Sequence, residues 1–215
     1  MIDFHTHTIL SDGELIASEL VRRAVVKGYE AIAITDHVDR SNIDFVLPRI
    51  VKVAKELNKY WKIKVLPGVE ISHVPLQEIG RLIRFARKKG AKIVLVHGET
   101  IVEPVIPGTN RKAIEGGADI LAHPGRLSIQ DARLAAKKGV YVELTTRKNH
   151  RKTNTEVIKA ARQTGVKMVL NTDTHSETDL IDDRKAKRFL KQLHLKESEI
   201  EKIISNSKKL LSVKA

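Results

Sequence analysis

The feature that most limits the fold is a regular alternation of short apolar runs, rich in β-branched residues, with amphipathic stretches of helical spacing. The apolar runs predict strands at 2–4, 31–35, 64–69, 93–96, 120–122, 140–144 and 167–171. The amphipathic stretches predict helices at 14–27, 47–59, 76–89, 110–116, 129–138, 154–164, 182–192 and 198–210. Strands that alternate with helices favour a parallel sheet, and seven such units predict a closed β/α barrel.

Glycine residues mark the ends of several predicted helices. Gly28, Gly90, Gly139 and Gly165 each follow a helical stretch and precede a strand, a position at which glycine commonly ends a helix. No stretch rich in proline, glycine or serine divides the 215 residues. We therefore expect residues 1–215 to form a single domain.

Histidine and carboxylate side chains follow the carboxyl ends of the predicted strands. The first strand is followed by "HTHTILSDG" and the second by "DH", the third ends in "PGVE", and the last is followed by "TDTH". Because the carboxyl ends of the strands of a β/α barrel meet on one face, we expect these side chains to lie together. The candidate metal ligands are His5, His7, Asp12, His37, Glu70, His97, His123, Asp173 and His175.

Metal binding explains this set better than ordinary structural roles. An isolated histidine at a strand end is more often hydrogen-bonded in a core or loop, and an isolated aspartate often caps a helix. Nine such groups on one face would be costly to bury without cations. The chain has no cysteine, and imidazole with carboxylate suits Zn²⁺, Mn²⁺ or Fe²⁺. Nine ligands exceed the needs of one ion, so we expect two or three divalent metal ions.

With these residues in view, the chain resembles the PHP (polymerase and histidinol phosphatase) superfamily of metal-dependent phosphoesterases. The resemblance extends over nearly the whole chain and rests on "DFHTHTILSDG", "ITDH", "PGVE", "VLVHGE", "ILAHPG" and "NTDTH". It implies an α/β fold with a distorted (β/α)7 TIM-like barrel, a PHP domain over residues 1–215, and usually a trinuclear metal centre.

The resemblance also implies how the ligands are divided among the ions. His5, His7, Glu70 and Asp173 would hold one ion, and Glu70 would bridge to a second ion held by His97 and His123. The third ion would be held by Asp12, His37 and His175. Some members of the superfamily have histidine where this chain has Asp12, and both residue types can bind a metal.

The resemblance implies hydrolysis of small phosphomonoesters, with histidinol phosphate as the first named substrate. Adjacent divalent ions lower the pKa of a bound water toward about 7, and the resulting hydroxide would attack phosphorus without a serine or cysteine nucleophile. The expected catalytic residues are His5, His7, Glu70, Asp173 and His175. Arg126 follows "AHPG" and Arg147 follows the sixth strand, so both are candidates for binding the substrate phosphate.

The main alternative is a nuclease or nucleotide phosphoesterase. The formal net charge of +13 favours an anionic partner such as nucleic acid, whereas an aromatic content of 4% leaves few residues for base stacking. A non-catalytic RNA-binding barrel, as in archaeal ribonuclease P, would have no need of nine ligands. An amidohydrolase typically has a lysine at a strand end, and the ligand series here contains none.

Location and partners are less constrained by the sequence. No signal-peptide pattern and no apolar run of roughly 18 residues is present, so we expect a cytoplasmic protein without membrane contact. The oligomeric state is left open. The C-terminal helices would pack on the barrel or on a partner, and their apolar spacing favours the barrel.

Weaker candidates for site residues are Asp36, Glu99 and Glu143 for orienting ligand histidines, and His73, Lys148 and His150 for contacting substrate.

Overall fold

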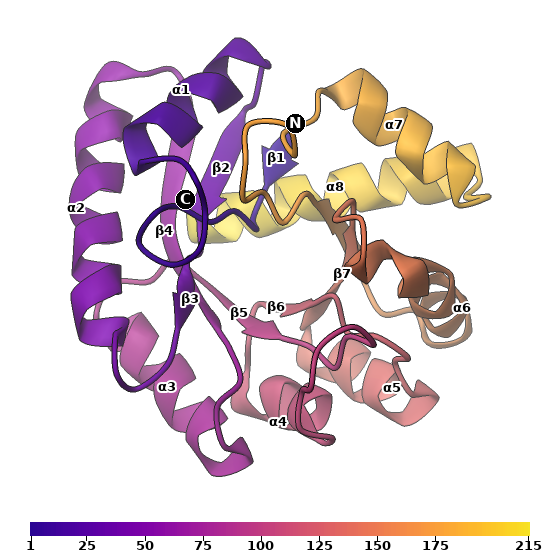
Figure 1. Ribbon diagram of the computed structural model, residues 1–215. Helices are drawn as coiled ribbons and strands as arrows, with labels where there is room; N and C mark the ends of the chain where they lie inside the picture. Colours follow the sequence, from indigo (N-terminus) through magenta and orange to yellow (C-terminus); the bar gives the residue numbers. More distant parts are fainter.

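The computed structural model describes residues 1–215, and its strands form a ring surrounded by helices (Figure 1). The strands are β1 (Ile2–Asp3), β2 (Ala31–Ile34), β3 (His37–Val38), β4 (Lys64–Ile71), β5 (Ile93–His97), β6 (Ile120–Ala122), β7 (Tyr141–Thr145) and β8 (Met168–Asn171). The helices are α1 (Ala17–Val26), α2 (Ile43–Tyr60), α3 (Leu76–Lys88), α4 (Thr109–Gly116), α5 (Ile129–Lys138), α6 (Asn154–Thr164), α7 (Asp183–Gln192) and α8 (Glu197–Lys214), with a short 3₁₀ helix at His150–Thr153. No helix has the length and apolar character needed to cross a membrane.

All strand pairs are parallel, and the strands follow the order β1-β2-β4-β5-β6-β7-β8. The ring closes between the segments that follow β1 and β8. There Thr6 and Thr174 form an isolated parallel bridge, and the His7 amide donates to the Thr174 carbonyl at 2.8 Å. Side chains complete the closure, since Asn171 Oδ1 accepts from the Phe4 amide at 3.0 Å. The predicted distorted (β/α)7 barrel is therefore confirmed.

The barrel has an apolar interior and a larger apolar layer between the strands and the helices. The interior includes Phe4, Leu66, Ile93, Leu95, Ile120 and Val169, and Leu210 of α8 belongs to the same cluster. The buried faces of the surrounding helices pack on the outside of the strands, as the amphipathic spacing predicts. Helix α8 therefore packs on the barrel, as its apolar spacing favours.

The predicted elements agree with the structure to within a few residues. Helix α2 begins at Ile43 rather than at 47, so Pro48 lies inside the helix. The helix tolerates this proline although proline has no N–H to donate to the preceding turn. Gly139 and Gly165 end their helices in the left-handed conformation, as expected of C-terminal glycines. The two-residue strand β3, which pairs with the second half of β4, and the 3₁₀ helix are too short to leave a periodic pattern and were not predicted.

Candidate metal centre

A polar cleft of about 390 Å³ opens where the carboxyl ends of the strands meet. Its lining contains no apolar residue and consists of Asp12, His37, Ser72, His73, His97, Glu103, His123, Arg147, His150, Asp173 and His175. His5, His7 and Glu70 lie beneath it and are fully buried. The structure thus brings all nine candidate ligands of the sequence to one face of the barrel, because each follows or ends a strand of the same parallel ring.

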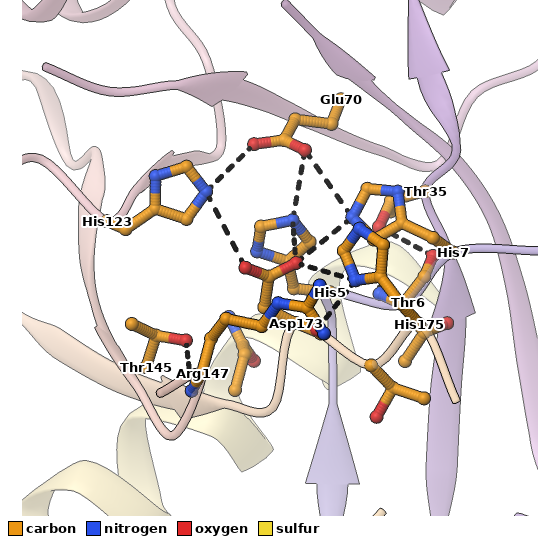
Figure 2. A network of polar contacts seen from close by, with 12 residues as sticks. His5, Thr6, His7, Thr35, Glu70, His123, Thr145, Arg147, Asp173 and His175 are labelled. Atoms are coloured by element: carbon orange, nitrogen blue, oxygen red, sulfur yellow. Dashed lines mark hydrogen bonds and ion pairs between the residues drawn. The ribbon is translucent and has the colours of Figure 1, made fainter. Parts of the chain in front are cut away.

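At the base of the cleft, two histidines and two carboxylates face one another (Figure 2). His5 Nε2 lies 3.1 Å from Glu70 Oε2 and 3.5 Å from Asp173 Oδ1. His7 Nε2 lies 3.5 Å from the same Glu70 oxygen and 3.2 Å from the same Asp173 oxygen. The two imidazoles therefore converge between two carboxylates, one from β4 and one from the segment after β8.

Two further groups of ligand atoms adjoin this base. Glu70 Oε1 faces His123 Nε2 at 3.4 Å, and His97 completes that group, whose ligand atoms lie within 4.8 Å of one another. On the other side, Asp12 Oδ2 is 3.1 Å from His175 Nε2 and 3.7 Å from His37 Nε2, and His7 belongs to this group as well. The Glu70 carboxylate thus faces His5 and His7 at the base through Oε2 and faces His123 through Oε1.

Several buried polar atoms of the site have no hydrogen-bond partner. They are both ring nitrogens of His7, Glu70 Oε1 and His123 Nδ1. A buried polar group without a partner costs about 1–3 kcal/mol, so a protein seldom retains several of them together. A neutral imidazole has one lone pair, so divalent cations would satisfy Glu70 Oε1 and one ring nitrogen of His7, and such imidazole and carboxylate donors are those that Zn²⁺, Mn²⁺ and Fe²⁺ accept. The residues therefore fit a centre of divalent metal ions.

The protonation of His7, Glu70 and Asp173 also suits metal binding. Burial and the neighbouring His37 lower the pKa of His7 to about 3, so its imidazole is neutral and keeps a lone pair near neutral pH. Burial opposes ionisation of Glu70, yet His5 and His37 hold the pKa of this carboxyl well below its ordinary value. Burial likewise opposes ionisation of Asp173, and His5 and His7 lower its pKa well below the ordinary value. Both carboxylates are therefore anionic over the physiological range, as metal binding would require.

Glu143, a weaker candidate from the sequence, holds two of the ligand segments in place. Its Oε1 accepts from His5 Nδ1 at 2.8 Å and from Asn171 Nδ2 at 2.8 Å, while its Oε2 accepts from the His123 amide at 2.8 Å. The bond to Nδ1 leaves His5 Nε2 facing Glu70 and Asp173. A carboxylate in this position orients a ligand imidazole and fixes its tautomer.

The other two weak carboxylate candidates order loops instead. Asp36 accepts from the Thr8 amide at 2.7 Å and from the Ser11 hydroxyl at 2.7 Å, so it shapes the loop that leads to Asp12. Glu99 accepts from the amides of Gly108 and Asn110, at 3.0 and 2.8 Å. Neither carboxylate is hydrogen-bonded to a ligand histidine.

Two of the candidate ligands adopt backbone conformations that side chains usually avoid. Asp173 has a φ of 55° and His123 a φ of 22°. Positive φ is uncommon for residues other than glycine, although aspartate and histidine adopt it more readily than most. Such strain concentrates at functional sites, where the surrounding structure enforces it.

The two candidate phosphate-binding arginines occupy different positions. Arg147 lines the cleft, and its Nη1 donates to Asp179 at 3.1 Å. Arg126 is exposed and is not part of the cleft lining.

Glu103 was not identified from the sequence, although it lines the cleft beside His97. It lies in the loop between β5 and α4, away from any strand end, and no periodic pattern in the sequence points to it. His73 and His150, weak candidates in the sequence, contact its carboxylate.

The PHP domain family model matches residues 3–212 of this chain. An uncharacterised protein of Methanocaldococcus jannaschii is 49% identical over 188 residues, which cover 86% of each protein. A probable phosphatase of Shewanella loihica is 28% identical, and the match covers 98% of this chain and 91% of that protein. The DNA polymerase/3'-5' exonuclease PolX of Bacillus subtilis is 28% identical over 85% of this chain but only 35% of its own length.

Solved structures share the fold at lower identity. A chain of an archaeal ribonuclease P with mature tRNA superposes with a TM-score of 0.74 at 20% identity, covering 98% of this chain and 90% of that one. The histidinol phosphate phosphatase of Lactococcus lactis, complexed with zinc, L-histidinol and phosphate, superposes with a TM-score of 0.59 at 18% identity and covers 97% and 93%. At these identities the likeness concerns the fold alone.

Proposed function

The chain belongs to the PHP domain family, and from that premise we propose that it is a metal-dependent phosphoesterase that hydrolyses small phosphomonoesters. The main support is the set of buried, unpartnered atoms of His7 and Glu70 beneath the cleft, since a protein without bound cations would gain nothing from them. The name of the Shewanella loihica relative, a probable phosphatase, agrees with this proposal.

We assign two or three divalent ions to the nine ligands His5, His7, Asp12, His37, Glu70, His97, His123, Asp173 and His175. When bound, ions of this kind supply positive charge for the phosphoryl oxygens and lower the pKa of a water molecule. The catalytic residues proposed from the sequence, His5, His7, Glu70, Asp173 and His175, all lie at the base or the rim of the cleft.

Residues around the proposed ligands position the groups that react. Glu143 keeps the His5 imidazole oriented, and Asp36 orders the loop with Asp12. Arg147 lines the cleft and presents a guanidinium, which can bind two phosphate oxygens at once. Arg126, exposed outside the cleft lining, would contact only the outer part of a larger substrate.

The cleft also favours a small and polar substrate. Its volume of about 390 Å³ is modest, and none of its lining residues is apolar. Such a lining suits a phosphomonoester with a polar alcohol, and histidinol phosphate is the first candidate because a fold neighbour is a phosphatase of that compound.

A nuclease or nucleotide phosphoesterase remains the second candidate, and one observation favours it specifically. A second cleft of about 270 Å³ shares Arg147 with the first and is also lined by Lys148, Arg151 and Lys185. These basic groups could bind a second phosphate of a polynucleotide next to the proposed reaction site. The PolX relative has an exonuclease activity in its name.

The test is phosphate release by Mn²⁺-loaded protein from histidinol phosphate, other small phosphomonoesters and short oligonucleotides, with Asp173→Asn as the inactive control. Fast turnover of one small ester would support the phosphatase. Shortening of oligonucleotides alone, with an affinity that falls steeply as salt rises, would support the nuclease. Equal signals from the wild type and Asp173→Asn would rule out both assignments to this site.

A further inference from the structure

Three imidazoles surround the carboxylate of Glu103, which is not one of the nine proposed ligands. Glu103 Oε2 lies 3.0 Å from His73 Nε2 and 3.0 Å from His97 Nε2. Its Oε1 lies 3.3 Å from His150 Nε2. Because His73, His97 and His150 come from three different segments of the chain, the barrel itself assembles this anion-binding pocket.

Two of these imidazoles can donate to an anion while they are neutral. His150 Nδ1 lies 2.7 Å from the Thr100 hydroxyl, which can donate to it and leave the hydrogen of the imidazole on Nε2. His73 Nε2 has Glu103 as its hydrogen-bond partner. His97 differs, because its Nδ1 donates to the Gly98 carbonyl at 3.2 Å and its Nε2 belongs to the proposed ligand set. His73 and His150 are therefore the two imidazoles around Glu103 whose Nε2–H groups can donate to an anion without taking part in the proposed metal centre.

The loop that presents Glu103 is anchored at its base but not at its tip. The Glu99 carboxylate accepts hydrogen bonds from the amides of Gly108 and Asn110, and these bonds fix the two ends of the loop to each other. Near the tip, Ile101 and Val102 are 51% and 39% exposed. These side chains add little apolar packing to the tip, so withdrawal of Glu103 would break chiefly its polar contacts with the histidines.

We propose that His73 and His150 form a binding pocket for a phosphate oxyanion of the substrate, and that Glu103 occupies this pocket when no substrate is bound. The inference rests on the proposed phosphoesterase function. Phosphate oxygens accept the same N–H donors as a carboxylate, and a phosphomonoester has more charge and more acceptor oxygens. Substrate phosphate therefore displaces Glu103 from the imidazoles, and the loop tip moves outward.

The test is calorimetric titration of Mn²⁺-loaded protein with inorganic phosphate, together with measurement of bound metal. Glu103→Ala removes the competing carboxylate, and we expect phosphate to bind about tenfold more tightly with unchanged metal content. Glu103→Gln keeps the shape without the charge, and we expect an intermediate gain. Glu56→Ala removes an equally negative but remote surface residue, paired with Lys59, and leaves phosphate affinity unchanged.

The donors are tested in the Glu103→Ala background. Adding His73→Asn or His150→Phe reverses the gain in phosphate affinity, and asparagine tolerates the φ of 54° that the partly exposed His73 adopts. Phosphate affinity in Glu103→Ala equal to or below that of the wild type would overturn the proposal. Loss of metal in Glu103→Ala would also overturn it, because Glu103 would then be a metal ligand. Absence of phosphoester hydrolysis by the wild type would reject the proposed function, and the phosphate titration would still decide the role of the pocket.

Discussion

Asp173 combines a strained backbone with a carboxylate that faces both buried histidines at the base of the cleft. Its Oδ1 faces His5 and His7, at 3.5 and 3.2 Å, while its φ is 55°. Asp173→Asn keeps the size and the tolerance of positive φ but removes the charge. We expect loss of at least one bound metal ion and a decrease in activity of about 100-fold or more, with an unchanged circular dichroism spectrum.

Asp44→Asn makes the same chemical change on the exposed face of α2 and serves as the control. Metal content and activity of that variant should equal those of the wild type. Full activity of Asp173→Asn would be incompatible with the assignment of the metal centre.

Glu143 acts on the site through His5 rather than through substrate. Its Oε1 accepts from His5 Nδ1, and the bond leaves Nε2 turned toward Glu70. Glu143→Gln keeps the size of the side chain but weakens this acceptor. We expect metal affinity to decrease about 10–100-fold, measured by competition with a chelating indicator. At saturating metal, activity should recover, and failure to recover would indicate a direct catalytic role instead.

At the scale of elements, α8 closes the amino end of the barrel with Leu210, which is buried in the interior cluster beside the strands. Leu210→Ala should lower the free energy of unfolding by about 2–5 kcal/mol, because the barrel interior cannot collapse around the cavity. Leu211→Ala, at the partly buried neighbour, should cost less. Chemical denaturation measures both, and metal content should be unchanged because the site lies at the opposite end of the strands.

The contact between α6 and α8 depends on pH. Arg162 donates to both oxygens of Glu199, at 2.8 and 2.9 Å, and the Lys196 amide donates to the same carboxylate. Arg162 and this amide lower the pKa of Glu199 to about 2. A lowered carboxyl pKa stabilises the fold above the ordinary value of 4.5 and loses that contribution as pH falls toward about 2.

Because Arg162 is largely exposed, the ion pair of Arg162 and Glu199 should contribute less than about 1 kcal/mol to the free energy of unfolding. Glu199→Gln should therefore remove a small part of the acid destabilisation between pH 5 and pH 2, as measured by thermal melts across that range. An identical pH profile for variant and wild type would show that the pair adds nothing to stability.

For the whole molecule, we expect metal binding at the proposed centre to be coupled to the stability of the barrel. The ring closes through the segments that contain His5, His7, Asp173 and His175, so ions bound to them would connect the first and last strands. A ligand that binds only the folded state at 100 times its dissociation constant adds about 2.7 kcal/mol. We expect chelation to lower Tm by several degrees and added Mn²⁺ to restore it in scanning calorimetry. A Tm that is independent of metal would contradict binding at this closure.

How well the sequence predicts the position of a side chain depends on whether the residue ends a strand or lies in a loop. His5, His7, Glu70 and Asp173 could be identified because strand periodicity places each of them at a known end of a parallel strand. Arg126 and Arg147 follow strands in the same way, yet only Arg147 lines the cleft, because loop conformation rather than strand order decides where a loop side chain points.

The sequence by itself determined the alternation of strands and helices, the parallel barrel and the place of the candidate ligands on one face of it, since each follows from local spacing along the chain. Only the tertiary structure decided that Glu143 supports His5, across 138 residues, and that Glu103 lies among His73, His97 and His150. The physical reason is that a loop residue has no periodic signal, and that contacts between distant segments depend on how the ring of strands closes.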